Sequence, residues 1–212
     1  LYASPVWTPL RFDMVGLKEI YSKYYATFKN AYSFFEMYAN ADNIDPREYD
    51  IKVEDRELID KWLLSKLNKL VRDVINAYEE YDLNKVVKLI VPFLNDDLSN
   101  WYIRSNRRRF WDSKLTKSKK SVYQTTYEVL VTLAKLTAPI TPYISDEIYT
   151  KLTGEESVHL ADFPKFNENL VNEEVEEKMD LVRDICSLGR DARETAKIKV
   201  RQPISEVLID SK

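Results

Sequence analysis

The sequence has few of the residues on which several common kinds of protein depend. Its 212 residues include three glycines and a single cysteine, Cys186. Three glycines are too few for a hairpin-rich sheet protein or for a glycine-rich phosphate loop. A lone cysteine excludes a disulfide framework and a multi-cysteine zinc site, and it suits a reducing compartment. We therefore expect a cytoplasmic chain with no metal site of its own.

Histidine and long apolar runs are also scarce. The sole histidine, His159, excludes paired-imidazole chemistry and is interpreted as a loop or interface residue. The carboxylates Asp96 and Asp97 are interpreted as ion-pair partners of the arginines that follow them, not as an acid–base pair. No apolar run is long enough to cross a membrane, and no signal segment is present. The sequence therefore predicts neither catalytic residues nor a membrane partner.

Charge is distributed unevenly along the chain, although the net charge is only −3. Residues 101–124 contain eight Lys and Arg against Asp112 alone. Residues 155–180 contain nine Asp and Glu against Lys165 and Lys178. A basic segment near an acidic one indicates an electrostatic surface for a charged partner. Two solvated faces without a partner are the alternative.

Apolar residues recur at helical spacing along most of the chain. The pattern predicts helices over residues 16–40, from the carboxylates at 54–57 to about 78, 82–111, 122–136, 142–152 and 172–195. Pro92 lies inside the third of these, so a kink is expected near Leu89. Short connections favour antiparallel neighbours. The predicted fold is therefore an all-α helical bundle over residues 13–195.

The end of the sequence has a different period. Lys197, Lys199 and Arg201 alternate with Ile198 and Val200, which is the pattern of a β-strand, and residues 207–209 are its candidate partner. Two short strands are not stable alone in water. Residues 196–212 are therefore expected to be the β-like start of a truncated further domain, and the chain to be part of a longer protein.

The basic segment begins with residues 100–111, NWYIRSNRRRFW, which combine four arginines with four aromatic residues. At about 100° per residue, Arg108 and Arg109 lie nearest the apolar stripe of the helix. They are predicted to be structural, paired with Asp97 or with a carboxylate of a neighbouring helix. Arg104 and Arg107 lie further towards solvent and are candidates for binding RNA through phosphate pairing and base stacking. The spacing alone leaves the structural and the RNA-binding interpretation of the cluster open.

The other candidate RNA-binding residues are the aromatic side chain of this segment and the cations that follow it in the sequence. They are Trp111, Lys114, Lys117, Lys119 and Lys120, together with Lys197, Lys199 and Arg201. Residues 114–118, KLTKS, also look like the K-M-S-K-S loop of class I aminoacyl-tRNA synthetases. That loop works with an H-x-G-H motif, which needs two histidines, so we interpret KLTKS as a basic loop between helices.

Several longer segments resemble the isoleucyl-tRNA synthetase family. They are SPVWTPLRF (4–12), NAYSFFEMYAN (30–40), DKWLLSKLN (60–68), DDLSNWYIRSNRRRFW (96–111), YEVLVTLAKLTAPITPYISDEIY (127–149), SVHL (157–160) and KVRQPISEV (199–207). The resemblance covers nearly the whole chain, in the order of the region that follows the catalytic core. The valyl, leucyl and methionyl enzymes have a related bundle and remain alternatives. Ser105 and Asn106 depart from the family pattern, in which a further arginine is common, so an unbroken basic stripe is not expected.

The resemblance implies a helical anticodon-binding domain, with residues 1–12 as the joint from the catalytic core. It implies tRNA(Ile) and that catalytic core as partners, and no DNA. For the full enzyme it implies isoleucine activation and tRNA charging, with ATP and Mg²⁺ and with zinc as a further candidate. The nucleotide-binding and editing domains are not expected in this chain, so no cofactor and no catalysis are expected from it. A helical protein-interaction domain and catalysis by this chain alone are the rival functions.

Overall fold

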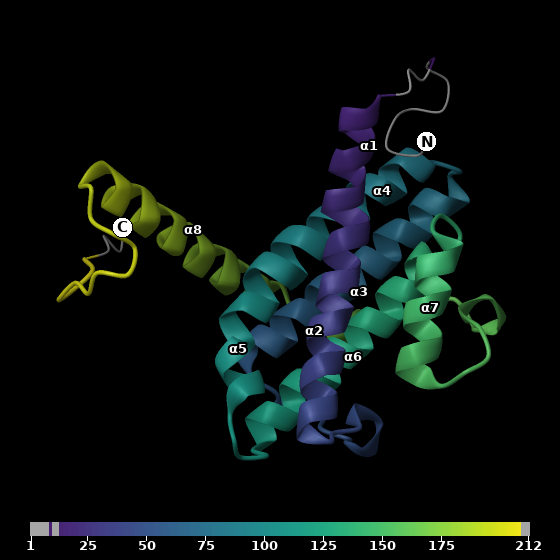
Figure 1. The fold of residues 1–212 in the computed structure, drawn as a ribbon, viewed down its shortest axis with the longest axis horizontal. Helices are drawn as coiled ribbons and strands as arrows, with labels where there is room; N and C mark the ends of the chain where they lie inside the picture. The colour runs from purple at the N-terminus through teal and green to yellow at the C-terminus, as the bar shows by residue number, and fades with distance from the viewer. Residues whose placement is uncertain (1–8, 10–12, 209–212) are drawn as a thin grey trace. The chain divides into compact units, whose positions relative to one another are not determined.

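The computed structural model describes Pro9 and residues 13–208. The chain divides into two compact units, residues 1–173 and residues 174–212, and each is described by itself. The described residues contain α-, 3₁₀- and π-helical segments and no β-strand (Figure 1). The all-α prediction is confirmed. The units separate after Glu173, whereas the sequence placed the last helix with the bundle and expected a boundary near residue 195.

One long helix begins the first unit. It consists of α1 (Met14–Ile20), a π-helical stretch (Tyr21–Ala26) and α2 (Thr27–Asp42). Asp13 caps its start, where the carboxylate accepts hydrogen bonds from the backbone N–H groups of Val15 at 3.1 Å and Gly16 at 3.0 Å. Asn43 ends it in the left-handed conformation, with φ of 51°. The helix predicted over residues 16–40 is therefore present and slightly longer.

Helix α3 (Leu58–Glu79) follows and pairs with a second long helix. That helix consists of α4 (Leu83–Pro92), a π-helical stretch (Phe93–Ile103) and α5 (Arg104–Trp111). The α geometry therefore continues to Pro92 and changes at Phe93, rather than near Leu89. The helix thus passes into α5 through a stretch with a wider turn, where i→i+5 hydrogen bonds replace the usual i→i+4 pattern.

The two π-helical stretches contact each other, and Asn95 joins them. Its amide nitrogen donates to the carbonyl oxygens of Lys23 at 2.7 Å and Val91 at 2.8 Å. Its carbonyl oxygen accepts from the hydroxyl of Thr27 at 3.0 Å. Backbone carbonyls that a π-helical turn leaves poorly paired need such partners. One side chain therefore stabilises the irregular turns of two helices.

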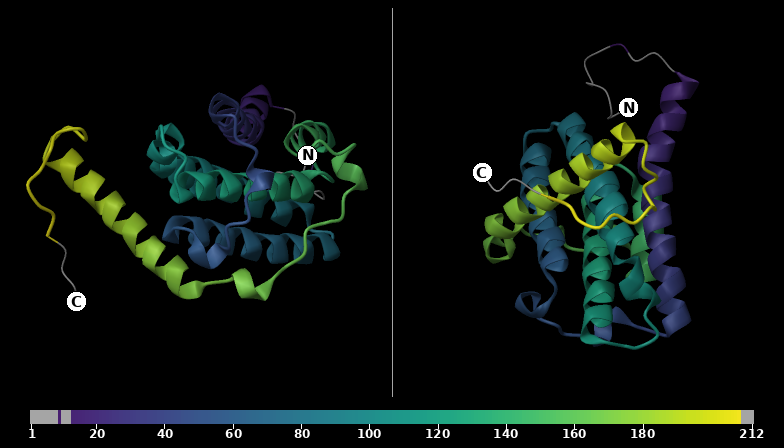
Figure 2. Two further views of the ribbon diagram at one scale, coloured as in Figure 1. Left: turned by 90° about the horizontal axis from the view of Figure 1, so that it is seen from below. Right: turned by 90° about the vertical axis from the view of Figure 1, so that its left-hand side faces the viewer.

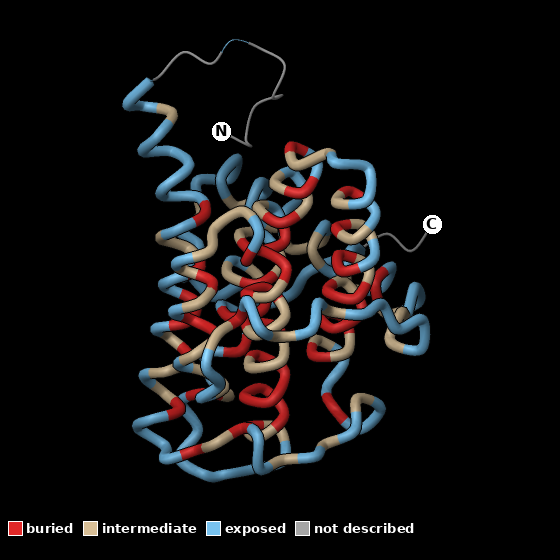
Figure 3. Tube along the Cα trace, turned by 90° about the vertical axis from the view of Figure 1, so that its right-hand side faces the viewer, coloured by how far each residue is buried: buried red, intermediate tan, exposed pale blue. Residues whose placement is uncertain are grey.

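Helix α6 (Lys117–Thr137) lies in the middle of the first unit. It packs against α2 and α7 (Pro142–Thr153) on one side and against α3 on the other (Figure 2). Thr116 caps its start, Pro142 opens α7, and Gly154 ends α7 with φ of 76°. Burial follows this arrangement, because the buried residues concentrate on the facing sides of the helices (Figure 3).

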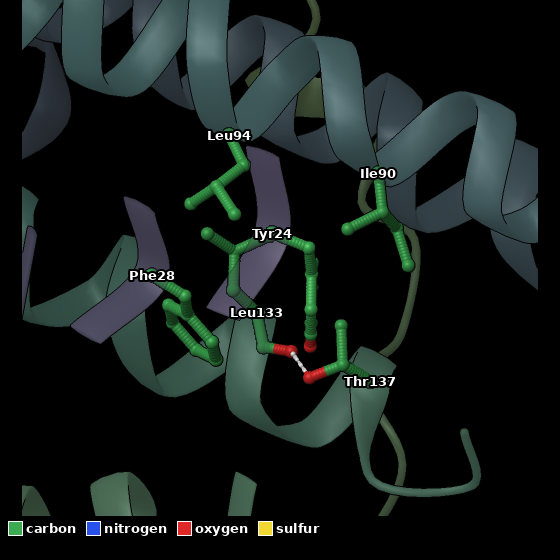
Figure 4. A pocket seen from close by; sticks show the side chains of 6 residues that line it. All are labelled: Tyr24, Phe28, Ile90, Leu94, Leu133 and Thr137. Atoms are coloured by element: carbon green, nitrogen blue, oxygen red, sulfur yellow. Dashed lines mark hydrogen bonds between the residues drawn. The ribbon is translucent and has the colours of Figure 1, made fainter. Parts of the chain in front are cut away.

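The core is close-packed. Tyr24, Phe28, Ile90, Leu94, Leu133 and Thr137 line a gap in it that has no room for a water molecule (Figure 4). The Thr137 hydroxyl is already bonded within the fold, because it donates to the carbonyl oxygen of Leu133 at 2.7 Å and lies 2.8 Å from the hydroxyl of Ser145. This gap is a packing feature of the core and offers no binding site.

The second unit consists mainly of α8 (Glu173–Thr195), which crosses the boundary by one residue. Lys197 follows with φ of 53°, and the N–H of Ile198 donates to the carbonyl oxygen of Arg193 at 2.8 Å. These are features of a helix C-terminus. The strand predicted from the alternation at 197–201 is wrong, because those residues form turns instead. Residues 207 and 208 of its expected partner are not in a strand, and Ile209 lies outside the described residues.

Candidate nucleic-acid interface

Three arginines of α5 are exposed on one face of the helix. Arg104 lies three residues before Arg107 and four before Arg108, so the three side chains are neighbours on the helix surface. None of them forms an ion pair within the described part of the chain. Like charges at this spacing repel and slightly destabilise a helix. An anionic partner would relieve that repulsion.

The position of Arg108 differs from the expectation. It was predicted to lie beside the apolar stripe, paired with Asp97 or with a carboxylate of a neighbouring helix, but it is exposed and the structure gives it no ion pair with a described carboxylate. The helical wheel assumed about 100° per residue from Leu94 onwards. The π-helical stretch before α5 turns by less per residue, so the buried side of α5 is shifted relative to that extrapolation.

Arg109 points the other way and is bound inside the protein. Its guanidinium donates to both carboxylate oxygens of Asp60, at 2.7 and 2.8 Å, and Asp60 is completely buried on α3. Burial opposes the charged form of Arg109, but the bonds to Asp60 and the charge of Asp60 raise the pKa of the guanidinium above its ordinary value. The hydroxyl of Tyr102 also donates to Asp60, at 2.6 Å. Arg109 is therefore occupied by α3.

The same guanidinium holds the start of α6. Arg109 donates to the hydroxyl of Ser118 at 2.9 Å and to its carbonyl oxygen at 2.7 Å. The Ser118 hydroxyl in turn donates to Glu57, next to the start of α3. One side chain of α5 thus connects the beginnings of two other helices, and it fixes one end of the loop at residues 112–116.

Lys119 fixes the other end of that loop, and its assignment as an RNA contact is corrected. Its side chain is only 3% exposed, and its ammonium lies 2.6 Å from the Asp42 carboxylate at the end of α2. It also donates to the carbonyl oxygen of Asp112 at 2.5 Å. The Asp42 carboxylate accepts a further bond from Tyr123. The ammonium of Lys119 is thus buried and bound to two acceptors of the fold, so it is not presented to a phosphate.

The remaining cations of the loop and of the start of α6 differ in their exposure and in their contacts with other side chains. Lys114 is exposed, and its backbone N–H is held by Asp112 at 3.0 Å. Lys117 forms an exposed ion pair with Asp55 at 3.3 Å, and such pairs contribute little stability. Lys120 lies over the ring of Tyr49, 5.0 Å from its centroid. Lys114 thus lies in the loop after α5, and Lys117 and Lys120 lie in the first turn of α6.

Trp111 lies at the end of the same face and is 56% exposed. Its indole nitrogen donates to the hydroxyl of Tyr38 on α2 at 2.7 Å. It follows Arg107 by four residues and Arg108 by three, so it is their neighbour on the helix surface. Tyr38 was not among the candidates, because its place in an apolar helical stripe gave no sign that its hydroxyl would bind an indole.

Lys197, Lys199 and Arg201 are exposed and belong to the second unit. Arg104, Arg107, Arg108 and Trp111 share one face of α5, and Lys114 follows in the exposed loop after it. We call these five residues the α5 face. A family model described as the anticodon-binding domain of tRNA ligases matches residues 60–209. The chain belongs to this family.

Relatives of this anticodon-binding domain are named isoleucine–tRNA ligases. It is 44% identical over 212 residues to the protein of Bacteroides thetaiotaomicron, covering 97% of this chain and 18% of the relative. It is 45% identical over 212 residues to that of Cytophaga hutchinsonii, covering 97% and 19%. It is 41% identical over 216 residues to that of Clostridium tetani, covering 99% and 21%. The chain thus spans about a fifth of the length of these relatives.

The described residues of the anticodon-binding domain provide no cluster of His, Cys, Asp and Glu side chains suited to a metal ion. None of its described helices is long and apolar enough to cross a lipid bilayer. His159 is exposed in a 3₁₀ turn, where its backbone N–H donates to Ser157. The chemistry that the α5 face offers is that of guanidinium, ammonium and indole groups, which suit a polyanion that carries flat rings.

Proposed function

We propose that this chain holds tRNA(Ile) by its anticodon stem and loop as part of an isoleucine–tRNA ligase. The observation that carries the proposal is the α5 face, where three neighbouring arginines are exposed without a carboxylate partner in the described residues. Guanidinium groups in this state form charge-assisted bonds to phosphate oxygens. The family match and the names of the relatives support tRNA as the polyanion.

The loop at residues 112–116 supports the same proposal. Arg109 and Lys119 anchor its two ends through two carboxylates, the completely buried Asp60 and the partly exposed Asp42. The cations in and beside the loop are therefore presented by a fixed backbone. Binding a ligand to a preorganised surface costs less conformational entropy than binding it to a mobile one. Arg109 and Lys119 thus position the surface, while Arg104, Arg107, Arg108 and Lys114 contact the RNA.

In the proposed full enzyme, isoleucine activation with ATP and Mg²⁺ and the charging of tRNA(Ile) are carried out outside this chain. The catalytic core of such an enzyme is then its second partner, and the cytoplasm its place of action. ATP–pyrophosphate exchange checks this division of labour. The purified chain is expected to show no exchange above the background of the assay.

The binding experiment measures the affinity of the chain for tRNA(Ile) at several salt concentrations. Affinity is expected to fall as salt rises, because phosphate contacts release counterions. Arg107→Ala is expected to reduce the slope of log affinity against log salt by about one, with little change in melting temperature. Lys88→Ala, which removes an exposed cation of α4, is the control and should leave the slope unchanged. Affinity that does not depend on salt would contradict the proposal and indicate a different kind of partner.

A further inference from the structure

Trp111 exposes an aromatic face that the fold does not use. More than half of its surface is exposed, although tryptophan is among the most buried residues on average. Its one polar atom, the indole nitrogen, is already bonded to the Tyr38 hydroxyl. What it presents to solvent is therefore apolar ring surface. A flat apolar ring that is held in place and left open is suited to stacking with another ring.

An aromatic cluster positions Tyr38 and, through its hydroxyl, the indole of Trp111. The ring of Tyr38 lies 4.8 Å from that of Phe34, and Phe34 lies 5.0 Å from Phe110 at an edge-to-face angle. Phe110 packs in the same way on Tyr123 of α6, at 5.0 Å. These rings come from α2, α5 and α6, so the Tyr38 hydroxyl has a defined position. The bond from Trp111 to this hydroxyl holds the indole against the protein.

The positive charge beside Trp111 indicates which kind of ring-containing ligand suits this surface. Arg107 and Arg108 lie one turn before Trp111 on the same face, and neither has an ion-pair partner in the described residues. A ligand for this surface therefore carries negative charge next to a flat ring. Single-stranded RNA has this combination, because its bases are free to leave the stack while its phosphates stay within reach. Duplex RNA has the phosphates but keeps its base faces covered.

We propose that Trp111 is a stacking platform for one unpaired RNA base. In this arrangement Tyr38 is a positioning residue that holds the indole, and Arg107 and Arg108 bind the phosphates on either side of the stacked base. This inference rests on the proposed function and deepens it. It assigns to the α5 face a preference for looped over paired RNA, and it divides the surface into a base-contacting part and a phosphate-contacting part.

Three RNAs of equal length and charge separate these parts. The first is a hairpin with a single-stranded loop, the second is the same hairpin with abasic loop nucleotides, and the third is a blunt duplex. Trp111→Ala in the 212-residue chain is expected to weaken hairpin binding by about 5-fold to 100-fold, the usual effect of losing one base–aromatic stack. Binding of the abasic hairpin and of the duplex should stay within twofold, and the salt dependence should not change.

Further variants assign the roles. Trp111→Phe keeps a ring and should retain most of the hairpin affinity. Tyr38→Phe removes only the hydroxyl and should weaken the hairpin less than Trp111→Ala does, without affecting the duplex. Should Trp111→Ala lower the melting temperature, Trp111→Leu makes the same test, because leucine covers Tyr38 with apolar atoms but has no ring face.

Equal loss of affinity for all three RNAs in Trp111→Ala would overturn the inference, and so would no loss for any. An effect of Trp111→Ala on binding to another protein alone, with RNA affinity unchanged, would also overturn it. Arg107→Ala distinguishes failure of this inference from failure of the proposed function, because it should weaken the binding of all three RNAs. If Arg107→Ala weakens them while Trp111→Ala does not, the inference fails and the proposed function stands. If neither variant affects RNA, both fail.

Discussion

Arg109 on α5 and Asp60 on α3 form a bidentate ion pair, with N–O distances of 2.7 and 2.8 Å. Asp60 is completely buried, and Arg109 is 12% exposed. Tyr102 provides a third hydrogen bond to the same carboxylate, and burial followed by the charge of Asp60 raises the pKa of that phenol well above its ordinary value. The carboxylate is thus surrounded by donors that stay protonated at physiological pH.

We expect Asp60→Asn to destabilise the first unit by about 3–5 kcal/mol, because Arg109 would keep a charge without its counterion. Replacing both residues, as in Asp60→Leu with Arg109→Met, should cost less than the single change, since no buried charge remains. Denaturant unfolding followed by circular dichroism measures both. A double variant less stable than the single one would show that the hydrogen bonds, and not the unpaired charge, dominate.

Lys119 and Lys117 provide a matched pair two residues apart. Lys119→Met should destabilise the chain by about 1–3 kcal/mol, because it leaves the Asp42 carboxylate, which is partly exposed, without its cation. Lys117→Met should change stability by less than about 0.5 kcal/mol, because its pair with Asp55 is exposed. The two variants should also differ in RNA binding: only Lys117→Met should reduce the slope of log tRNA affinity against log salt. If Lys119→Met reduced this slope and Lys117→Met did not, Lys119 would be the residue that contacts RNA.

Asp146 should make the loop after α7 sensitive to acid. Its carboxylate accepts bonds from the Ser157 hydroxyl at 2.7 Å and the Val158 N–H at 2.8 Å. These two bonds lower the pKa of Asp146 below its ordinary value of 3.8. The stabilisation is therefore fully present above pH 3.8 and is lost as the pH falls through the lowered pKa. Carboxyl NMR titration should report a pKa below 3.8, which Ser157→Ala should bring closer to 3.8.

Tyr81 ends α3 in a conformation that disfavours any residue with a Cβ atom. Its φ is 55°, its side chain is 89% exposed, and the N–H of Asp82 closes the helix by donating to Ala77 at 2.9 Å. Tyr81→Gly should raise the free energy of unfolding by up to about 1 kcal/mol, after the entropy that glycine adds to the unfolded chain. Tyr81→Ala is the control and should give no gain. If Tyr81→Ala were more stable than the unchanged chain, the tyrosine ring itself would be unfavourable there.

The periodic parts of the fold were predictable from the sequence. The stripe from Leu17 to Tyr38 and the one from Ile59 to Tyr78 have the spacing of a helix face, and both segments are helical. From Tyr24 onwards this spacing marks the residues of the first helix that face the core, whereas Leu17 and Ile20 of α1 are exposed. The direction of Arg108 was not predictable by the same rule, because the π-helical stretch changes the rotation per residue without a clear signal in the sequence.

Two other differences have local physical causes. The sequence predicts Lys119 to be an exposed cation, but in the fold its ammonium contacts two acceptors, the Asp42 carboxylate and the carbonyl oxygen of Asp112 across the loop. Such a site depends on tertiary contacts that no spacing encodes. At residues 197–201, the strand-like alternation competes with the end of α8, where Arg193 binds the carbonyl oxygens of Lys199 and Gln202. A strand also needs a partner, and the described residues provide none.

The π-helical stretch before α5 has a consequence for how this chain tolerates changes in length. Each residue of this π-helical stretch turns the chain by somewhat less than the roughly 100° of an α-helix, so deleting one residue between Phe93 and Ile103 with the stretch otherwise unchanged would rotate everything that follows on the same helix by nearly that angle. Arg104, Arg107 and Arg108 would turn away from solvent, and Arg109 would leave Asp60. Surface substitutions elsewhere on this helix can accumulate one at a time. A deletion or insertion in this stretch instead needs a second, compensating change in length before α5. The number of residues in this segment is therefore constrained.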